Sequence, residues 1–210
     1  MFGPSAGWHL PASFLGRFEK LDCIDPDPLA RWIFLRRFRG MNIDWHFDDY
    51  LGGDQAAARG PLDIDRLGQL FADFPHTAFL FPNVISQISG LFAETVYAVD
   101  EPPRASAHFV AWKSALAGHL AGRSWACFHD RLSASAPPLI ADGDLVHEVN
   151  SAELAQLAWG HLDVAIDAYD ALTDGIAADL PRRLMVWQRE PGMFHVVEAM
   201  SVVASTKGRV

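Results

Sequence analysis

The spacing of apolar residues predicts one long helix in the C-terminal third of the chain. Between Asn150 and Leu172 apolar side chains recur at three- and four-residue intervals, which is the period of a helix with one buried stripe. Asn150 is a favourable N-cap, and Glu153 lies three residues later, where its carboxylate can accept a hydrogen bond from the N-cap amide. We therefore expect a core helix over residues 150–172.

The other face of this expected helix is acidic. It carries Asp163, Asp167 and Asp170, with Asp174 just beyond its end. Negative charge at the negative end of a helix dipole costs about 0.3–1 kcal/mol per carboxylate, so a cation is expected nearby. That cation comes either from a basic partner or from the one basic concentration in the chain, Arg36, Arg37 and Arg39.

Three further helices are predicted from caps and stop signals. The first begins at Asp27-Pro28 and ends near Gly40, and the second runs from an Asp63 cap to Pro75. A third follows the break at residues 101–104 and ends at Gly122. Residues 79–99 fit either a helix started by Asn83 or two strands, because their helical spacing is combined with β-branched side chains, and the helix is favoured.

Alternating patterns predict the strands. Apolar and polar residues alternate from Asn42 as far as the glycines at 52–53, which predicts a strand or an extended segment. Residues 124–128 suggest a short strand, and residues 133–144 suggest a surface loop. Two β-prone runs flank Glu190-Pro-Gly192, which is a turn signal. The prediction is an α+β fold, with about five helices packed on a small, mainly antiparallel sheet that includes a C-terminal hairpin. Residues 1–204 are expected to form a single compact domain, followed by a flexible tail at 205–210.

Composition narrows the range of partners. The chain has 210 residues, half of them apolar, with 17 basic and 26 acidic side chains and a net charge of −9. This charge repels nucleic acid and anionic lipid surfaces, and it favours a basic protein surface or a cationic ligand. The only cysteines, Cys23 and Cys127, suit a reducing compartment, and no apolar run approaches the roughly 20 residues of a membrane span. We expect a cytoplasmic protein, with an oligomeric state that the sequence leaves open.

One segment has the spacing of a metal site. In Asp44-x-His46-x-Asp48 the alternation of an extended chain places three potential ligands on one face. The alternative is an ordinary solvated strand face, and this alternative is favoured, so no metal site is predicted. Asp49 and Tyr50 add polar groups at the same place.

Four residues are candidates for catalysis if the protein is an enzyme. Cys127 and His129 share one face of a predicted strand, His161 projects from the long predicted helix, and Glu198 falls on an apolar strand face. A bare carboxylate there is costly, so either its pKa is raised or an arginine such as Arg182, Arg183 or Arg189 pairs with it. A structural role is favoured for each of the four.

The motifs of nucleotide-dependent transfer, zinc hydrolysis and α/β-hydrolase chemistry are absent, so no cofactor is expected. The favoured hypothesis is an acidic protein-binding domain, such as an inhibitor or an immunity-type antidote to a basic toxin. Its predicted contact residues are acidic or aromatic: Asp163, Asp167, Asp170, Asp174, Asp48, Asp49 and Tyr50.

Two alternatives stay open. The first is a small enzyme or ligand-binding domain, metal-dependent or not, with a pocket that gathers histidines and carboxylates. Its candidate residues are His46, Asp48, His129, His161, His195 and Glu198. The second is a homo-oligomer subunit without chemistry of its own.

Overall fold

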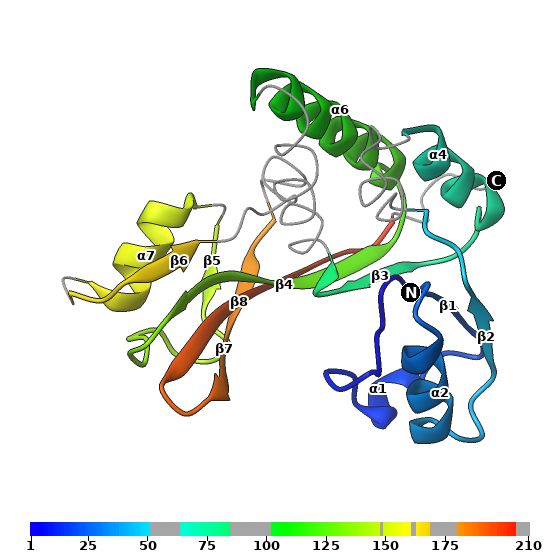
Figure 1. Ribbon diagram of the computed structural model, residues 1–210, viewed down its shortest axis with the longest axis horizontal. Coiled ribbons are helices and arrows are strands. Elements are labelled where there is room, and N and C mark those ends of the chain that lie inside the picture. The colour runs from blue at the N-terminus through cyan, green and yellow to red at the C-terminus, as the bar shows by residue number, and fades with distance from the viewer. Residues whose placement is uncertain (51–63, 85–101, 148, 161–162, 169–179, 205–210) are drawn as a thin grey trace.

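The computed structural model describes residues 1–50, 64–84, 102–147, 149–160, 163–168 and 180–204. Within these residues the chain forms five helices and eight strands (Figure 1). The helices are α1 (Ala12–Leu15), α2 (Pro28–Arg37), α4 (Ile64–Asp73), α6 (Pro102–Leu120) and α7 (Ser151–Trp159). The strands are β1 (Leu21–Ile24), β2 (Ile43–His46), β3 (Phe79–Pro82), β4 (Trp125–Ala134), β5 (Leu145–Val146), β6 (Ile166–Ala168), β7 (Arg182–Glu190) and β8 (Met193–Val202).

The strands form two sheets that a short N-terminal segment joins. One sheet is the parallel pair β1–β2, and the other has the order β3-β4-β8-β7-β5, with β6 paired to β4. The amide of Phe2 donates to Leu80 of β3, while Gly3 donates to Ile24 of β1, each at 2.9 Å. Residues 1–3 therefore lie between β1 and β3 as an additional parallel strand.

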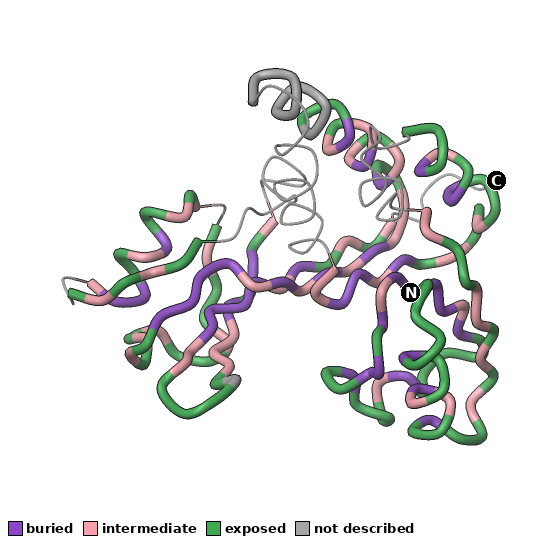
Figure 2. Tube along the Cα trace, viewed as in Figure 1, coloured by how far each residue is buried: buried purple, intermediate pink, exposed green. Residues whose placement is uncertain are grey.

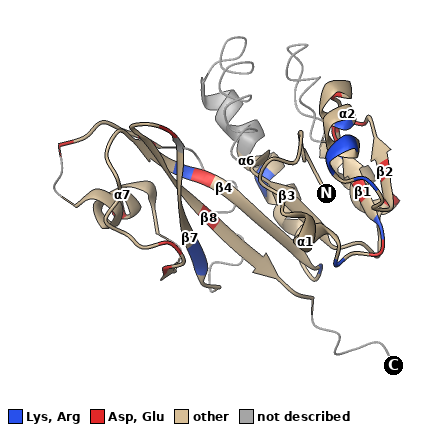
Figure 3. Ribbon diagram, turned by 90° about the horizontal axis from the view of Figure 1, so that it is seen from below, with Lys and Arg blue, Asp and Glu red and all other residues tan. Residues whose placement is uncertain are grey.

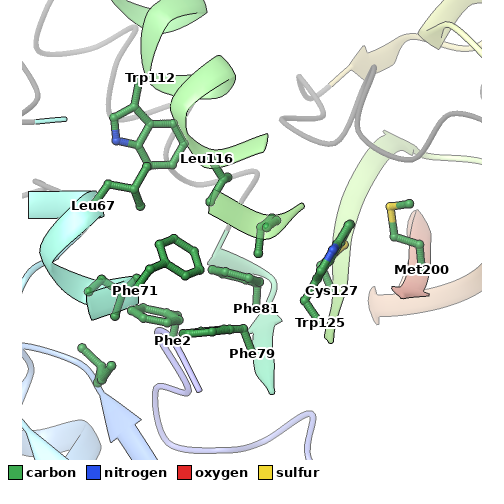
Figure 4. Packing of buried hydrophobic residues seen from close by; sticks show 13 residues of the cluster. Phe2, Leu67, Phe71, Phe79, Phe81, Trp112, Leu116, Trp125, Cys127 and Met200 are labelled. Atoms are coloured by element: carbon green, nitrogen blue, oxygen red, sulfur yellow. The ribbon is translucent and has the colours of Figure 1, made fainter. Parts of the chain in front are cut away.

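Helices cover both faces of this combined sheet. On one face α1 and α2 place Leu15, Phe34 and Phe38 against the apolar side chains of β1. On the other face α4 and α6 pack on β3 and β4, and Figure 4 shows Phe71 and Leu116 close to Phe81. At the far end of the sheet α7 forms a third cluster with β4, β7 and β8, and buried positions follow the central strands throughout (Figure 2).

The fold is α+β, as the sequence predicted, and several local signals are confirmed. Asp27 caps α2 by accepting a 2.8 Å hydrogen bond from the Leu29 amide. Helix α4 ends before Pro75, and β7 and β8 form the predicted C-terminal hairpin. Within the main sheet only the β3–β4 pair is parallel among the described strands. No described helix is long and apolar enough to cross a membrane.

The long helix predicted over residues 150–172 is wrong in its second half. Its start is confirmed, because Asn150 and Glu153 exchange the two hydrogen bonds of a capping box, at 2.9 and 3.1 Å. The helix ends at Trp159, where Gly160 has φ +61°. Ile166–Ala168 is strand β6, whose pairing with β4 satisfies the backbone that a helix would otherwise satisfy internally.

Two other predictions are corrected, and one is met in the part that the structure describes. Residues 79–82, ahead of the helix expected from Asn83, are a strand; Val84 is helical, and 85–99 lie outside the described residues. The break predicted at 101–104 overlaps the start of α6, because proline is tolerated in the first turn of a helix. Strand β4 continues to Ala134, six residues beyond the short strand expected over 124–128 and into the surface loop expected over 133–144.

Candidate functional site

The parallel strands bring several loops to one edge of the sheet. β2, β1, residues 1–3 and β3 run in the same direction, so their carboxyl ends lie together. The loops that leave this edge begin at Gly3, Asp25, Phe47 and Asn83. In open sheets of this kind ligands bind in the crevice outside the carboxyl ends of the strands.

A glycine turn follows the first of these strands. Backbone φ is positive at Gly3 (+51°), Ser5 (+48°) and Gly7 (+70°). A Cβ at Gly3 would lie 2.8 Å from Val84 Cγ2, and one at Gly7 would lie 2.6 Å from the ring of Phe38. Both positions therefore require glycine for conformation and for space, and the backbone between them is held close to its neighbours.

Asp25, at the carboxyl end of β1, fixes this turn. One carboxylate oxygen accepts the Ser5 amide at 2.9 Å and the other accepts the Asp27 amide at 3.0 Å. The residue is only 7% exposed. The turn and the neighbouring strand are thus tied together by a buried acidic side chain that lies 22 residues after Gly3.

A cavity of about 420 Å³ adjoins this edge, between the loop that carries His9 and strands β4 and β7. Asn83 and Asp130 form reciprocal hydrogen bonds on its wall: Asn83 Nδ2 donates to Asp130 Oδ2 at 3.2 Å, and the Asp130 amide donates to Asn83 Oδ1 at 3.1 Å. His9 packs edge-on against Trp187, with ring centroids 4.7 Å apart. The cavity is therefore partly aromatic and carries a rigidly held carboxylate.

His195 lies behind the cavity wall. It is 4% exposed, and its Nδ1 is 3.5 Å from Asp130 Oδ1. Within the described part of the chain neither ring nitrogen of His195 makes a hydrogen bond, and neither does Asp130 Oδ1. Of the three suggested pocket histidines that the structure describes, His46, His129 and His195, it is His195 that lies beside this cavity's carboxylate.

The opposite face of the same strands contains a buried ion cluster. Arg131 donates to Glu198 Oε2 at 2.6 Å and Arg182 donates to Oε1 at 2.7 Å, and all three side chains are fully buried. Figure 3 marks these charged positions within β4, β7 and β8. The predicted pairing of Glu198 with Arg182 is confirmed, whereas Arg131 was not foreseen. Arg183 is exposed and donates to the Gly143 carbonyl instead.

Cys127 and His129 do not have the electrostatics of a nucleophile and its base. Burial raises the pKa of the Cys127 thiol, and the negative charge of Glu198 raises it further. Burial lowers the pKa of His129 to about 3, helped by the positive charges of Arg131 and Arg182. An active thiolate needs a lowered pKa, and the surroundings of Cys127 shift its pKa in the opposite direction.

The segment considered for a metal is engaged in ion pairs. Lys20 lies 2.8 Å from Asp44 and 3.1 Å from Asp22, and His46 Nε2 is 3.0 Å from Asp22. Burial alone would raise the pKa of Asp22, but hydrogen bonds from His46 and Lys20 outweigh it and lower the pKa. Asp48 makes no third ligand with Asp44 and His46, since the described residues contain no group of three or more His, Cys, Asp or Glu side chains arranged to hold a metal.

The residues predicted to bind a basic partner do not form one helical face. Asp163 and Asp167 are exposed but lie beyond the end of α7, and Asp170, Asp174 and the catalytic candidate His161 lie outside the described residues. The Asp49 carbonyl accepts from Arg66, and the Tyr50 hydroxyl donates to Asp73 at 2.9 Å, so both join the loop after β2 to α4. The partner itself stays a prediction.

Among the described residues, Arg36 and Arg37 of α2 make no ion pair with Asp163 or Asp167, contrary to the internal pairing that we considered. Arg36 lies over the ring of Trp32 and Arg37 over that of Trp8, at 5.6 and 4.9 Å from the ring centroids. Helix α2 and strand β6 are at opposite ends of the molecule in Figure 1. Cation–π contacts thus replace the expected ion pairs.

No family model matches the chain, and no curated protein and no solved structure matches it either. The chemistry of the site therefore rests on its own geometry.

The buried cluster generates a stability prediction. Glu198→Gln removes the charge that two buried arginines face, so we expect the free energy of unfolding to fall by about 3–5 kcal/mol in urea denaturation. Glu190→Gln, at the exposed end of the hairpin, is the matched control and should change it by less than about 0.5 kcal/mol. A Glu198→Gln variant as stable as the wild type would contradict the structural role of the cluster.

The burial of His129 leads to a second prediction, on how the stability of the fold depends on pH. Its pKa is about 3 in the folded state against 6.5 ordinarily, so between these values the unfolded chain binds a proton that the folded chain does not. Stability should therefore be lost as pH falls below 6.5, with a contribution of up to about 1.4 kcal/mol per pH unit from this residue. In denaturation experiments from pH 7 to pH 5, the free energy of unfolding should fall less steeply with pH in His129→Gln than in the wild type. Equal pH slopes in the two proteins would rule out a neutral, buried imidazole.

Proposed function

We propose that this protein is a ligand-binding domain or small enzyme that binds a nucleoside at the carboxyl edge of its parallel strands. The observation that carries the proposal is the glycine turn at residues 3–7, tied through Ser5 to Asp25 on the neighbouring parallel strand. In dinucleotide-binding folds a glycine turn after the first strand lets the ligand approach the backbone, and an acidic residue about 20 positions later binds the ribose hydroxyls.

Asp25 has the acceptor capacity for a ribose. An ionised carboxylate has roughly four acceptor positions. Each of its oxygens accepts one amide from the loops on either side, those of Ser5 and Asp27. The remaining lone pairs support binding of the two vicinal hydroxyls of a ribose, while the amides hold the carboxylate in place.

The charges at this edge favour a ligand without phosphate. The turn itself, Gly3-Pro-Ser-Ala-Gly7, contains no lysine or arginine, and its two glycines do not have the Gly-x-Gly-x-x-Gly spacing of the dinucleotide fingerprint. The adjoining loops carry Asp25, Asp27 and Asp48. Helix α1 has only four residues, so its dipole adds little for an anion. An uncharged or cationic nucleoside therefore suits the edge better than a nucleotide.

The test is a calorimetric titration of the protein with adenosine, AMP and S-adenosylmethionine, which is a nucleoside with a sulfonium cation. We expect adenosine and S-adenosylmethionine to bind, AMP to bind at least about tenfold more weakly, and 2′,3′-dideoxyadenosine to lose about tenfold or more relative to adenosine. The loss for the dideoxy compound follows from the ribose hydroxyls that Asp25 would bind.

The matched variants are Asp25→Asn and Asp44→Asn. The first removes the charge proposed to bind the ribose, and the second removes the same charge from an exposed carboxylate paired with Lys20. The affinity for adenosine should fall in Asp25→Asn and stay unchanged in Asp44→Asn. Thermal unfolding of both variants shows whether they remain folded. Binding of none of the nucleosides, or equal binding of adenosine and its dideoxy analogue, would refute the proposal.

A further inference from the structure

The cavity beside Asp130 has the lining of a second binding site. Its walls combine apolar and aromatic side chains, Phe128, Met185, Val197 and Trp187, with two carboxylates, Asp130 and Asp142. Its volume of about 420 Å³ is within the roughly 300–1,000 Å³ of small-molecule sites. Such a composition suits a ligand with an apolar body and one polar group.

The strand pattern explains why this lining is placed here. Phe128 and Asp130 of β4 alternate with Cys127 and His129, which lie on the opposite, buried face. Val197 is the direct partner of Asp130 in the β4–β8 ladder. The cavity therefore sits on a rigid sheet, with its carboxylate next to an apolar neighbour.

Asp130 is held as an acceptor in this wall. Its Oδ2 and its amide are bonded to Asn83, which fixes the side chain. Its Oδ1 is buried and faces His195 Nδ1 at 3.5 Å, behind the wall. Asp130 lines the cavity, and its Oδ2 accepts one hydrogen bond from Asn83, which leaves lone-pair capacity for a charge-assisted hydrogen bond from a ligand ammonium.

The residues that line the cavity also indicate the charge of its ligand. The described residues around the cavity include two carboxylates and no lysine or arginine. An anionic ligand would face uncompensated repulsion there, whereas a cation gains from both carboxylates and from the net charge of −9.

We propose that this cavity binds a small organic cation, with its amine on Asp130 and its apolar body against Phe128, Met185 and Trp187. The site is separate from the glycine turn and does not depend on the nucleoside proposal.

The test compares three probes of similar shape by calorimetry: phenethylamine, uncharged 2-phenylethanol and anionic phenylacetate. We expect phenethylamine to bind at least about tenfold more tightly than the other two, since only it forms the charged hydrogen bond. Asp130→Asn should reduce its affinity to the level of 2-phenylethanol. Asp167→Asn, which removes the same charge from the exposed strand β6, should leave it unchanged.

A second variant tests the same cavity in case Asp130→Asn impairs folding. Met185→Trp places a larger side chain in the cavity from β7 and keeps Asp130, so it should abolish phenethylamine binding while the thermal unfolding midpoint stays close to that of the wild type. Equal binding of the amine and the alcohol, no binding of the amine, or full affinity in Asp130→Asn or Met185→Trp would overturn the proposal.

Discussion

The architecture depends on the main-chain hydrogen bonds of three residues, Met1 to Gly3. Ile24 donates to the Met1 carbonyl, Gly3 donates to Ile24, and Phe2 donates to Leu80, all at 2.9 Å. They join the pair β1–β2 to the larger sheet, and Ile24 of β1 shares a hydrophobic cluster with Phe81 of β3 across the same junction. With them, four parallel segments share one carboxyl edge, and the turn at Gly3 to Gly7 falls beside Asp25.

The two faces of the central strands have opposite electrostatic roles because side chains alternate along β4. Asp130 lies on the cavity face with Phe128, and Arg131 lies on the buried face with His129, whose ladder partner is Glu198. The β4–β8 register shifts between Asp130 and Leu132, so Leu132 also returns to the buried face. The ion cluster accounts for the perturbed groups that otherwise suggest catalysis, and Asp130 is on the other side of the sheet.

Local signals in the sequence predicted local structure well. The caps at Asp27 and Asn150 and the hairpin at Glu190-Pro-Gly192 involve neighbours in sequence, and all three are present. The pairing of Glu198 with Arg182 followed from strand alternation across the hairpin. Arg131 was missed because the strand expected over 124–128 was too short to include it, although β4 continues to Ala134.

The features that escaped prediction depend on partners distant in sequence. Residues 160–172 continue a helical spacing, yet Gly160 ends the helix and β6 finds its partner in β4, more than 30 residues earlier. Strand β1 is four residues long and lies between β2 and residues 1–3. The role of Asp25 requires that pairing, so neither Asp25 nor the turn from Gly3 to Gly7 was predicted as a site. The available signal was the two glycines of the turn and the Asp25-Pro26 step.

The central claim is that the glycine turn and the end of β1 form one binding edge, and backbone amide shifts test it most directly. In a ¹⁵N-labelled protein titrated with adenosine, the account predicts that the amides of Gly3, Ser5, Gly7 and Asp27 shift together and saturably, because they surround Asp25. Shifts confined to the α7 end of the sheet, with these four amides unmoved, would contradict it.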